Sequence, residues 1–169
     1  MDARARDIRL LCIDVDGVLT TGHLHFQADG THTKAFHVRD GAAIKWLQKA
    51  GIPVAFISGL DSPSTWARAR QLGVEDCFAG SLAKGPILDQ LCAKYGLEPR
   101  QVAHLGDDLP DLPLLRQVGL ACCPADAVAE VREACHLVVP VQGGAGVLRP
   151  VAERILKAQG CWEAVLAGY

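Results

Sequence analysis

The chain has 169 residues, of which half are hydrophobic and 21% are charged, so its length and composition fit one ordinary globular domain and exclude a disordered chain. The formal net charge is -2, which gives no electrostatic case for binding nucleic acid or an anionic membrane surface. The start of the chain is charged and lacks the apolar stretch of a signal peptide, and no window is long enough for a membrane span.

Short apolar runs alternate with helical patterns along most of the chain. The predicted strands of this alternating pattern lie at about 8–15, 52–58, 76–78, 102–105, 121–122 and 137–139. The predicted helices lie at about 40–50, 63–72, 86–95, 111–118, 127–134 and 147–158. Such alternation is typical of the α/β class, with a parallel sheet flanked by helices on both faces. We therefore predict a single Rossmann-like domain over residues 1–169.

Residues 22–38 break this pattern. The pair Asp29-Gly30 is a strong hairpin turn signal, and we predict strands at about 22–27 and 33–37 on either side of it. The fold is therefore expected to carry a β-hairpin inserted after the first strand. Residues 160–169 are expected to form a C-terminal tail.

The seven cysteines are odd in number and irregularly spaced, and several of them lie in apolar runs. Buried free thiols in a reducing cytoplasm explain this pattern better than a disulfide framework does. Cys122 and Cys123 are adjacent, which is not the usual spacing of zinc ligands. We expect a cytoplasmic protein without a metal-thiolate site.

Polar side chains follow several of the predicted strands. Asp14 and Asp16 follow the first strand, Ser58 ends the next one, and the pair Asp107-Asp108 follows the strand at 102–105. Ligands of open parallel sheets bind beyond the carboxyl ends of the strands, so these side chains are expected to face one pocket. Carboxylates that converge in one pocket repel each other unless a cation is present, and Mg²⁺ prefers oxygen ligands. We therefore predict a Mg²⁺ site with Asp14, Asp16 and Asp107 as ligands.

This set of residues suits phosphoryl transfer, which needs a nucleophile, an acid, a metal and donors for the phosphate oxygens. Asp14 is the predicted nucleophile, and Asp16 is predicted to protonate the leaving oxygen and then to activate water. Ser58 and the Gly59 amide could cradle the phosphate, while Lys84 could offset negative charge.

Two further acids, Asp108 and Asp111, are given supporting roles, and Asp111 could orient Lys84 or support the metal shell. Taken singly, each of these patterns is more often a turn, a cap or a surface lysine than part of a catalytic site. Their joint placement after successive strands is what supports the enzyme interpretation.

The same residues resemble the motifs of the haloacid dehalogenase superfamily of phosphatases. The four motifs correspond to 14–20 (DVDGVLT), 57–59 (ISG), Lys84, and 106–111 (GDDLPD). The resemblance implies a Mg²⁺-dependent phosphoric monoester hydrolase with a phospho-aspartate intermediate on Asp14.

Residues 34–41, 101–108 and 143–149 resemble a capless subgroup of this family. This resemblance implies a homotetramer in which the hairpins of four subunits meet and each neighbour helps to cover an active site, with the C-terminal tail as a further cover. It also implies a small sugar-acid phosphate as the substrate, the eight-carbon octulosonate phosphate of lipopolysaccharide assembly in particular. No nucleic acid or membrane partner is expected.

Two positions depart from the family pattern, because Leu60 and Ala145 stand where the family usually has arginine. Arg39, Asp40 and Arg68 remain as candidate substrate-binding residues. The departures leave two alternatives open: a phosphatase of a nine-carbon sialic-type acid phosphate, and a catalytically weakened relative with an assembly or regulatory role. A dehalogenase is disfavoured because a halide needs no acid such as Asp16, and a mutase because no cap domain is inserted.

Overall fold

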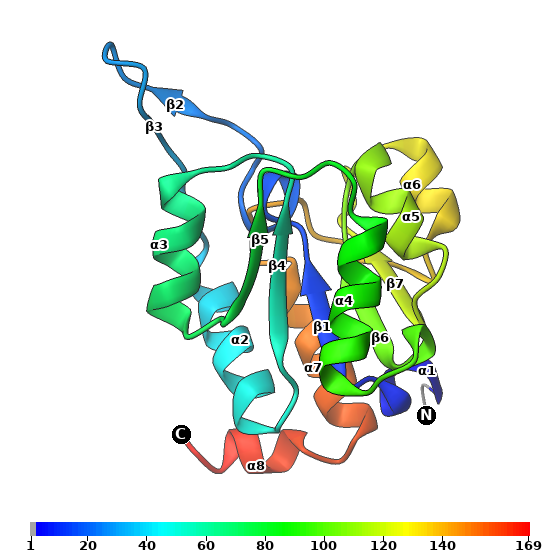
Figure 1. The fold of residues 1–169 in the computed structure, drawn as a ribbon. Helices are drawn as coiled ribbons and strands as arrows, with labels where there is room; N and C mark the ends of the chain where they lie inside the picture. Colours follow the sequence, from blue (N-terminus) through cyan, green and yellow to red (C-terminus); the bar gives the residue numbers. More distant parts are fainter. Residues whose placement is uncertain (1–2) are drawn as a thin grey trace.

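The fold, seen in a computed structural model that describes residues 3–169, is built on a six-stranded parallel sheet with the order β5-β4-β1-β6-β7-β8 (Figure 1). The strands of this sheet are β1 (Leu10–Ile13), β4 (Val54–Ser58), β5 (Asp76–Ala79), β6 (Val102–Leu105), β7 (Leu120–Cys123) and β8 (Leu137–Val138). The helices are α1 (Ala3–Asp7), α2 (Val38–Lys49), α3 (Pro63–Leu72), α4 (Gly85–Tyr95), α5 (Leu112–Leu115), α6 (Ala129–Ala134), α7 (Leu148–Ala158) and α8 (Trp162–Leu166). This arrangement confirms the predicted α/β class and the parallel sheet.

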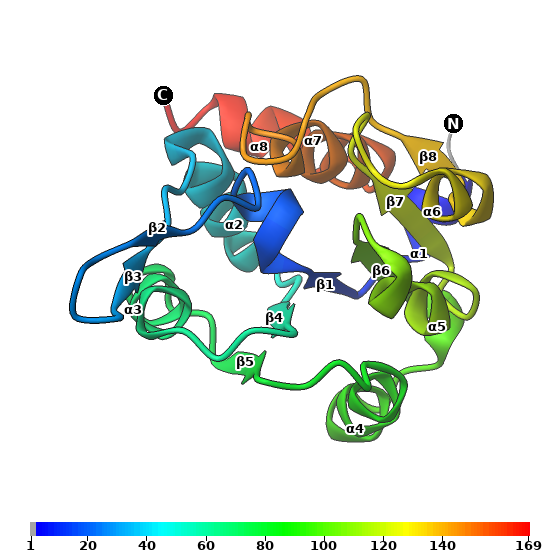
Figure 2. The same cartoon turned by 90° about the horizontal axis from the view of Figure 1, so that it is seen from above.

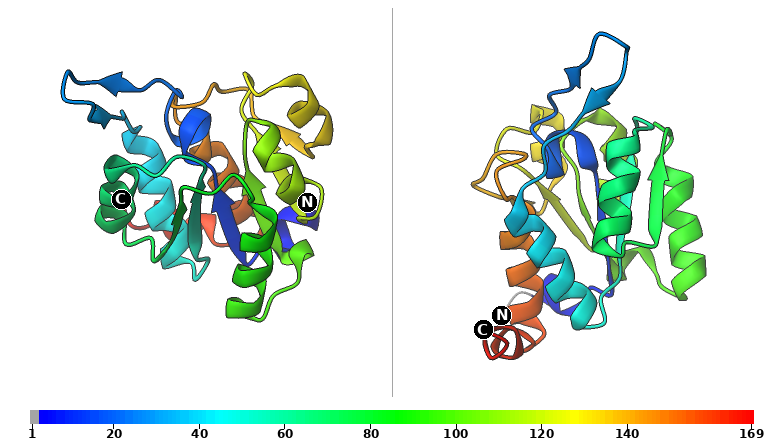
Figure 3. Two further views of the ribbon diagram at one scale, coloured as in Figure 1. Left: turned by 45° about the horizontal axis from the view of Figure 1, so that its top comes forward. Right: turned by 90° about the vertical axis from the view of Figure 1, so that its left-hand side faces the viewer.

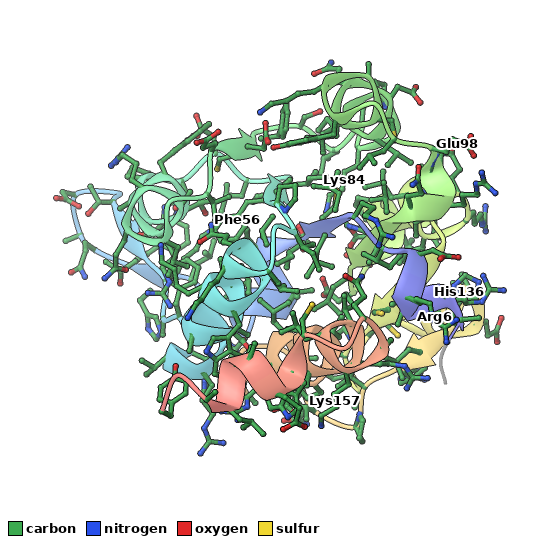
Figure 4. All side chains as sticks on the ribbon, turned by 90° about the horizontal axis from the view of Figure 1, so that it is seen from below. Arg6, Phe56, Lys84, Glu98, His136 and Lys157 are labelled. Carbon is green, nitrogen blue, oxygen red and sulfur yellow. The ribbon has the colours of Figure 1, made fainter. Side chains whose placement is uncertain are left out.

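Helices cover both faces of the sheet, as the view from above shows (Figure 2). Successive side chains of a strand point to opposite faces. In β1, Leu11 and Ile13 join the core under α2 and α7, whereas Leu10 and Cys12 join the core under α4, α5 and α6. The largest of the fully buried side chains is Phe56 of β4, labelled in Figure 4. Because both faces are covered, the central strands read as continuous apolar runs.

Local signals in the sequence set the limits of several helices. Pro63 opens α3, where its missing N–H costs no helical hydrogen bond, and Gly73 ends that helix with a φ of 64°. Gly96 ends α4 in the same left-handed conformation, also with a φ of 64°. The prediction for α3 was therefore correct to the residue, and that for α4 was correct to one residue.

The predicted helix at 111–118 is a shorter and mixed element. A 3-10 turn occupies Leu109–Asp111, and α5 follows it as a single turn at Leu112–Leu115. Pro110 and Pro113 each lack the backbone N–H that a continuous α-helix needs, which accounts for the division. The prediction also missed α1 and α8.

The hairpin is present, but its strands are shorter than predicted. Only β2 (His25–Phe26) and β3 (His32–Thr33) pair, and they do so antiparallel. Figures 1 and 3 show this hairpin projecting from the end of the molecule where the sheet strands terminate. No layer of the described chain covers it, and Phe26 is 66% exposed.

The C-terminal tail folds back on its own chain. Trp162 of α8 packs edge-on against Trp46 of α2 with ring centroids 5.6 Å apart, and Trp46 Nε1 donates a hydrogen bond of 3.0 Å to Tyr169 Oη. Figure 1 places α8 at the end of the molecule opposite the hairpin. Within residues 3–169, the helices are all too short or too polar to cross a membrane.

The loop before β7 provides a test of this packing. Gly119 donates its backbone N–H to the carbonyl oxygens of Pro99 and Val102 at 3.1 and 3.0 Å, and an added Cβ would lie 1.8 Å from the backbone oxygen of Arg100. We expect Gly119→Ala to lower the free energy of unfolding by roughly 1–3 kcal/mol, because backbone has to move to make room. Urea unfolding measures this change.

The matched control is Gly85→Ala in the first turn of α4, where the nearest atom to an added Cβ is 3.8 Å away. Alanine costs less conformational entropy in a helix than glycine, so this variant should be neutral or more stable by up to about 1 kcal/mol. Equal urea midpoints for Gly119→Ala and the parent chain would contradict the described packing of this loop.

Candidate active site

A cavity of about 350 Å³ opens at the carboxyl ends of β1, β4 and β6. Its polar wall consists of Asp14, Asp16, Lys84, Asp107, Asp108 and Asp111. Its other wall carries the side chains of Leu24, Leu60 and Leu82. The structure therefore brings the predicted acids and the predicted lysine together in one place, as expected for a parallel sheet.

Asp14 begins this site at the end of β1. Its backbone N–H donates to the carbonyl of Leu105 at 2.9 Å, which joins the β1 end to the β6 end. The chain then makes one tight turn over Val15–Leu19, in which Gly17 adopts a φ of 89°. An added Cβ at position 17 would lie 2.1 Å from Asp107 Oδ2. Glycine is thus required here both for the turn and for the approach of the Asp107 carboxylate.

Lys84 is buried between two carboxylates, with only 2% of the residue exposed. Its Nζ donates to Asp14 Oδ1 and to Asp111 Oδ1, each at 2.7 Å. Its side chain lies in the interior of the molecule (Figure 4), although it comes from the loop just before α4. Burial alone would lower the pKa of Lys84, but the two carboxylates raise it, so this lysine is a fixed cation.

Asp14, Asp107 and Asp111 each offer one carboxylate oxygen to a group whose members lie within 4.8 Å of one another. Burial is the main cause that raises the pKa of Asp107 to about 8, and the neighbouring Asp14 contributes to this increase. Burial also raises the pKa of Asp14 to about 6, against the opposing effect of Lys84. Among the described residues, Asp107 Oδ1 is buried and has no hydrogen-bond partner. A divalent cation would relieve both the repulsion and the missing partner, so the site fits a hard metal ion.

The carboxylate of Asp111 is already committed to other contacts. Its Oδ1 faces Lys84 and also His104 Nε2, the latter at 2.8 Å. Its Oδ2 accepts the backbone N–H groups of Asp107 and Asp108 at 3.1 and 3.3 Å. Burial would raise the pKa of Asp111, but the hydrogen bonds from His104 and Lys84 hold it well below its usual range. Asp111 therefore orients the lysine and the Asp107 loop. This leaves Asp107, and Asp14 with its one contact to Lys84, as the carboxylates available to a metal.

Asp16 lines the cavity, but its carboxylate is outside this group of three. Both of its carboxylate oxygens lie 2.8 Å from Lys34 Nζ, and its Oδ2 accepts a hydrogen bond from Ser58 Oγ at 3.1 Å. The role of the Asp16 side chain as a metal ligand stays a prediction.

The predicted phosphate cradle lies beside Asp16. Ser58 is fully buried, whereas Gly59 and Leu60 line the cavity. An added Cβ at Gly59 would lie 2.6 Å from Leu82 Cδ2, so the apolar wall packs closely on this turn. The Leu60 side chain therefore stands at the cavity where the family pattern has an arginine.

Three predicted substrate-binding residues are not among the cavity-lining residues. Arg39 is exposed at the start of α2, and Asp40 is buried and accepts the backbone N–H of Arg149 at 3.1 Å. Arg68 donates to the carbonyl of His37 at 3.4 Å and lies over the ring of Phe36. Burial raises the pKa of Asp40 to about 6, since its main partner is a neutral N–H. These contacts join α2 to its neighbours, and direct substrate binding by the three residues stays a prediction.

The site also contains residues that the sequence analysis did not select. Lys34 pairs with Asp16, and His104, fully buried in β6, contacts Asp111. An added Cβ at Gly143 would lie 1.8 Å from the backbone oxygen of Gly17, so the 143–146 loop packs on the Asp14 turn. Lys34 and Gly143 both lie in stretches that resemble the family, and this resemblance could have marked them as site residues. Nothing in the sequence marked His104 as a site residue, because it occupies an ordinary position within a predicted buried strand.

Comparisons with known proteins agree with this geometry. The sequence pattern of haloacid dehalogenase-like hydrolases matches residues 34–119. The 3-deoxy-D-manno-octulosonate 8-phosphate phosphatase of Haemophilus influenzae is 41% identical over 160 residues, which cover 95% of this chain and 89% of that protein.

Two solved structures are also similar. A yrbi family phosphatase from Pseudomonas syringae has a TM-score of 0.96 and 46% identity, and the match covers 98% of this chain and 94% of that one. The Moraxella catarrhalis 3-deoxy-D-manno-octulosonate 8-phosphate phosphatase, solved with a magnesium ion, a phosphate ion and KDO, has a TM-score of 0.95 and 36% identity, with 98% and 95% covered.

These matches extend over nearly the whole chain. The four predicted motifs thus occupy one cavity in a fold shared with phosphatases of known structure. The chain belongs to the haloacid dehalogenase-like hydrolase family.

Proposed function

We propose that this protein is a Mg²⁺-dependent phosphomonoesterase that hydrolyses 3-deoxy-D-manno-octulosonate 8-phosphate. The observation that carries the proposal is the contact of Lys84 with Asp14 beside the unpartnered carboxylate oxygen of Asp107. The names of the relatives from Haemophilus influenzae and Moraxella catarrhalis support the substrate.

In the proposed reaction, a carboxylate oxygen of Asp14 attacks phosphorus and the bond from phosphorus to the sugar oxygen breaks. Asp16 gives a proton to the departing sugar oxygen and then takes one from the water that cleaves the phospho-aspartate. Lys84 keeps Asp14 ionised and offsets the negative charge that gathers around the phosphate. Asp14 and Asp107 would hold Mg²⁺, which supplies positive charge to the phosphate oxygens.

The substrate assignment depends on the wall that carries Leu60. A leucine at the cavity cannot make the bidentate contact that a guanidinium makes with phosphate or carboxylate. The Ala145 side chain, on the exposed surface of the 143–146 loop, cannot make one either. A nine-carbon sialic-type acid phosphate is therefore the second candidate, and a catalytically weakened relative with an assembly role is the third. A panel of sugar-acid phosphates with Mg²⁺ separates these candidates by their kcat/KM values.

We propose further that the protein acts in the cytoplasm and forms a homotetramer. All seven cysteines are free thiols, which suits a reducing compartment. Two strands of two residues each are too little to hold a hairpin on their own, and the exposed Phe26 suits burial against another subunit.

The first prediction concerns the nucleophile. Replacement of Asp14 by asparagine removes the attacking carboxylate, so we expect kcat for the octulosonate phosphate to fall by at least about 1,000-fold. Phosphate release measures this loss. Asp89→Asn, on the exposed surface of α4, is the matched control and should retain full activity. The proposal fails if Asp14→Asn keeps its activity, or if the parent enzyme hydrolyses no phosphate of the panel with Mg²⁺.

A second prediction links pH to metal binding. The folded metal-free chain holds protons on Asp14 and Asp107 up to pKa values of about 6 and 8, whereas the unfolded chain releases them near 3.8. The folded state thus binds more protons between these values, so metal-free stability should fall as pH rises from about 4 to 8. Bound Mg²⁺ compensates both charges. The increase of Tm on adding Mg²⁺ should therefore be larger at pH 8 than at pH 5, as measured by thermal unfolding.

Asp107→Asn is the control for this experiment. The variant removes one of the two repelling charges, so its metal-free Tm at pH 8 should exceed that of the parent chain, and Mg²⁺ should raise it little. Equal effects of Mg²⁺ at pH 5 and pH 8 in the parent chain would contradict the metal assignment.

A third prediction concerns assembly. Phe26→Asp places a charge on strand β2 of the hairpin and should reduce the molar mass measured by light scattering from that of a tetramer to that of smaller species. Leu166→Asp, on α8 at the opposite end of the molecule and 51% exposed, is the control and should leave the mass unchanged. A parent protein that is monomeric would exclude the tetramer.

A further inference from the structure

Lys34 is a buried cation that reaches Asp16, at the wall of the cavity, from the base of the hairpin. It follows β3 directly, and its side chain is fully shielded from solvent. Its Nζ lies 2.8 Å from both carboxylate oxygens of Asp16 and donates a hydrogen bond of 3.1 Å to Thr65 Oγ1 of α3. A shielded ammonium group is stable only when it is paired, and the partner of Lys34 is the Asp16 carboxylate.

Asp16 in turn depends on Lys34 for its place. Its Oδ2 has two donors, Lys34 and Ser58, but Ser58 Oγ also lies 3.0 Å from the carbonyl of Leu60, and its single proton can serve only one of these acceptors. Its Oδ1 is buried and receives no hydrogen bond from the described chain, so the Lys34 ammonium at 2.8 Å is its compensating charge. Without Lys34 the Asp16 carboxylate, whose side chain is 26% exposed, would keep only the shared Ser58 hydroxyl as a donor from the described chain, and it would turn toward water.

We propose that Lys34 is a positioning residue that holds the Asp16 carboxylate where it exchanges protons with the leaving oxygen and with the attacking water. This inference rests on the proposed function, in which Asp16 is the acid and base. Lys34 itself touches no reacting atom, and it carries no covalent step. A purely structural role would instead be to tie the hairpin to α3 through Thr65.

The leaving group distinguishes these roles. An alkyl phosphate such as a sugar phosphate releases an alkoxide that needs a proton from Asp16, whereas p-nitrophenyl phosphate releases a stable nitrophenolate that needs none. In Lys34→Met we expect the rate of phosphoenzyme formation from the alkyl phosphate to fall by about 100-fold or more. With p-nitrophenyl phosphate, the same variant should still release one equivalent of nitrophenolate per site in a fast burst. The slow phase after the burst should reflect impaired attack of water.

Three further variants complete the experiment. Asp16→Asn should reproduce the same pattern. The double variant with Lys34→Met should add little to it, because both changes disable the same proton transfer by Asp16. Lys34→Arg keeps the charge and should recover at least about tenfold of the rate lost with the alkyl phosphate. Thr65→Val removes the anchor on α3 and leaves Asp16 in place, so its activity on both substrates should remain near that of the parent enzyme.

Equal slowing of the two substrates in the burst phase of Lys34→Met, or an unchanged rate with the alkyl phosphate, would overturn the inference. A pattern that appears in Asp16→Asn but not in Lys34→Met sinks the role of Lys34 and leaves the proposed function standing. Absence of phosphatase activity in the parent enzyme sinks the proposed function itself. If Lys34→Met does not fold, Lys34→Gln is measured instead, and the same difference between the two substrates is required.

Discussion

The salt bridge of Lys84 with Asp14 and Asp111 is the contact on which the rest of the site depends. One ammonium group joins the end of β1, the start of α4 and the turn after β6, at 2.7 Å from each carboxylate. Asp111 extends this contact by accepting the N–H groups that shape the Asp107 loop. Loss of either carboxylate would leave the buried ammonium with only one of its two partners, so the three residues form one unit rather than three separate features.

The carboxylates around this unit outnumber its ammonium group. Lys84 is shared between two acids, and Asp107 stands close by with no cation of its own among residues 3–169. The pKa values of Asp14 and Asp107 are raised because both carboxylates are buried and are held close together. This arrangement destabilises the metal-free folded chain, but it presents two carboxylates to a metal. Gly17 makes the arrangement sterically feasible, because any side chain there would collide with Asp107. The same close carboxylates therefore lower the stability of the metal-free protein and raise its affinity for the metal.

The sequence predicted those parts of the structure that follow from local pattern and from the rule of parallel sheets. The order of strands and helices, the limits of α3 and the convergence of Asp14, Lys84 and Asp107 all belong to this class. Contacts between distant segments were not predictable in this way. Arg68 looked like a spare cation for the substrate, yet its guanidinium lies over Phe36, and Lys34 looked like one residue of a hairpin, yet its side chain pairs with Asp16. Periodicity shows which face a residue occupies, but it carries no information on which distant partner it meets.

Chemistry and recognition are consequently built on different parts of this fold. The carboxylates that we propose act on phosphorus sit at the ends of rigid buried strands, and their geometry follows from the sheet. The walls that would recognise the sugar acid consist of loops and the base of the hairpin, where Leu24, Leu60 and Leu82 stand. Leucines exclude water and strengthen the electrostatics of the carboxylates, but they cannot select an anionic sugar by hydrogen bonds. Selection by this chain must then come from groups beyond that wall. If the proposed homotetramer forms, the exposed hairpin is the element best placed to bring groups of a neighbouring subunit to the cavity.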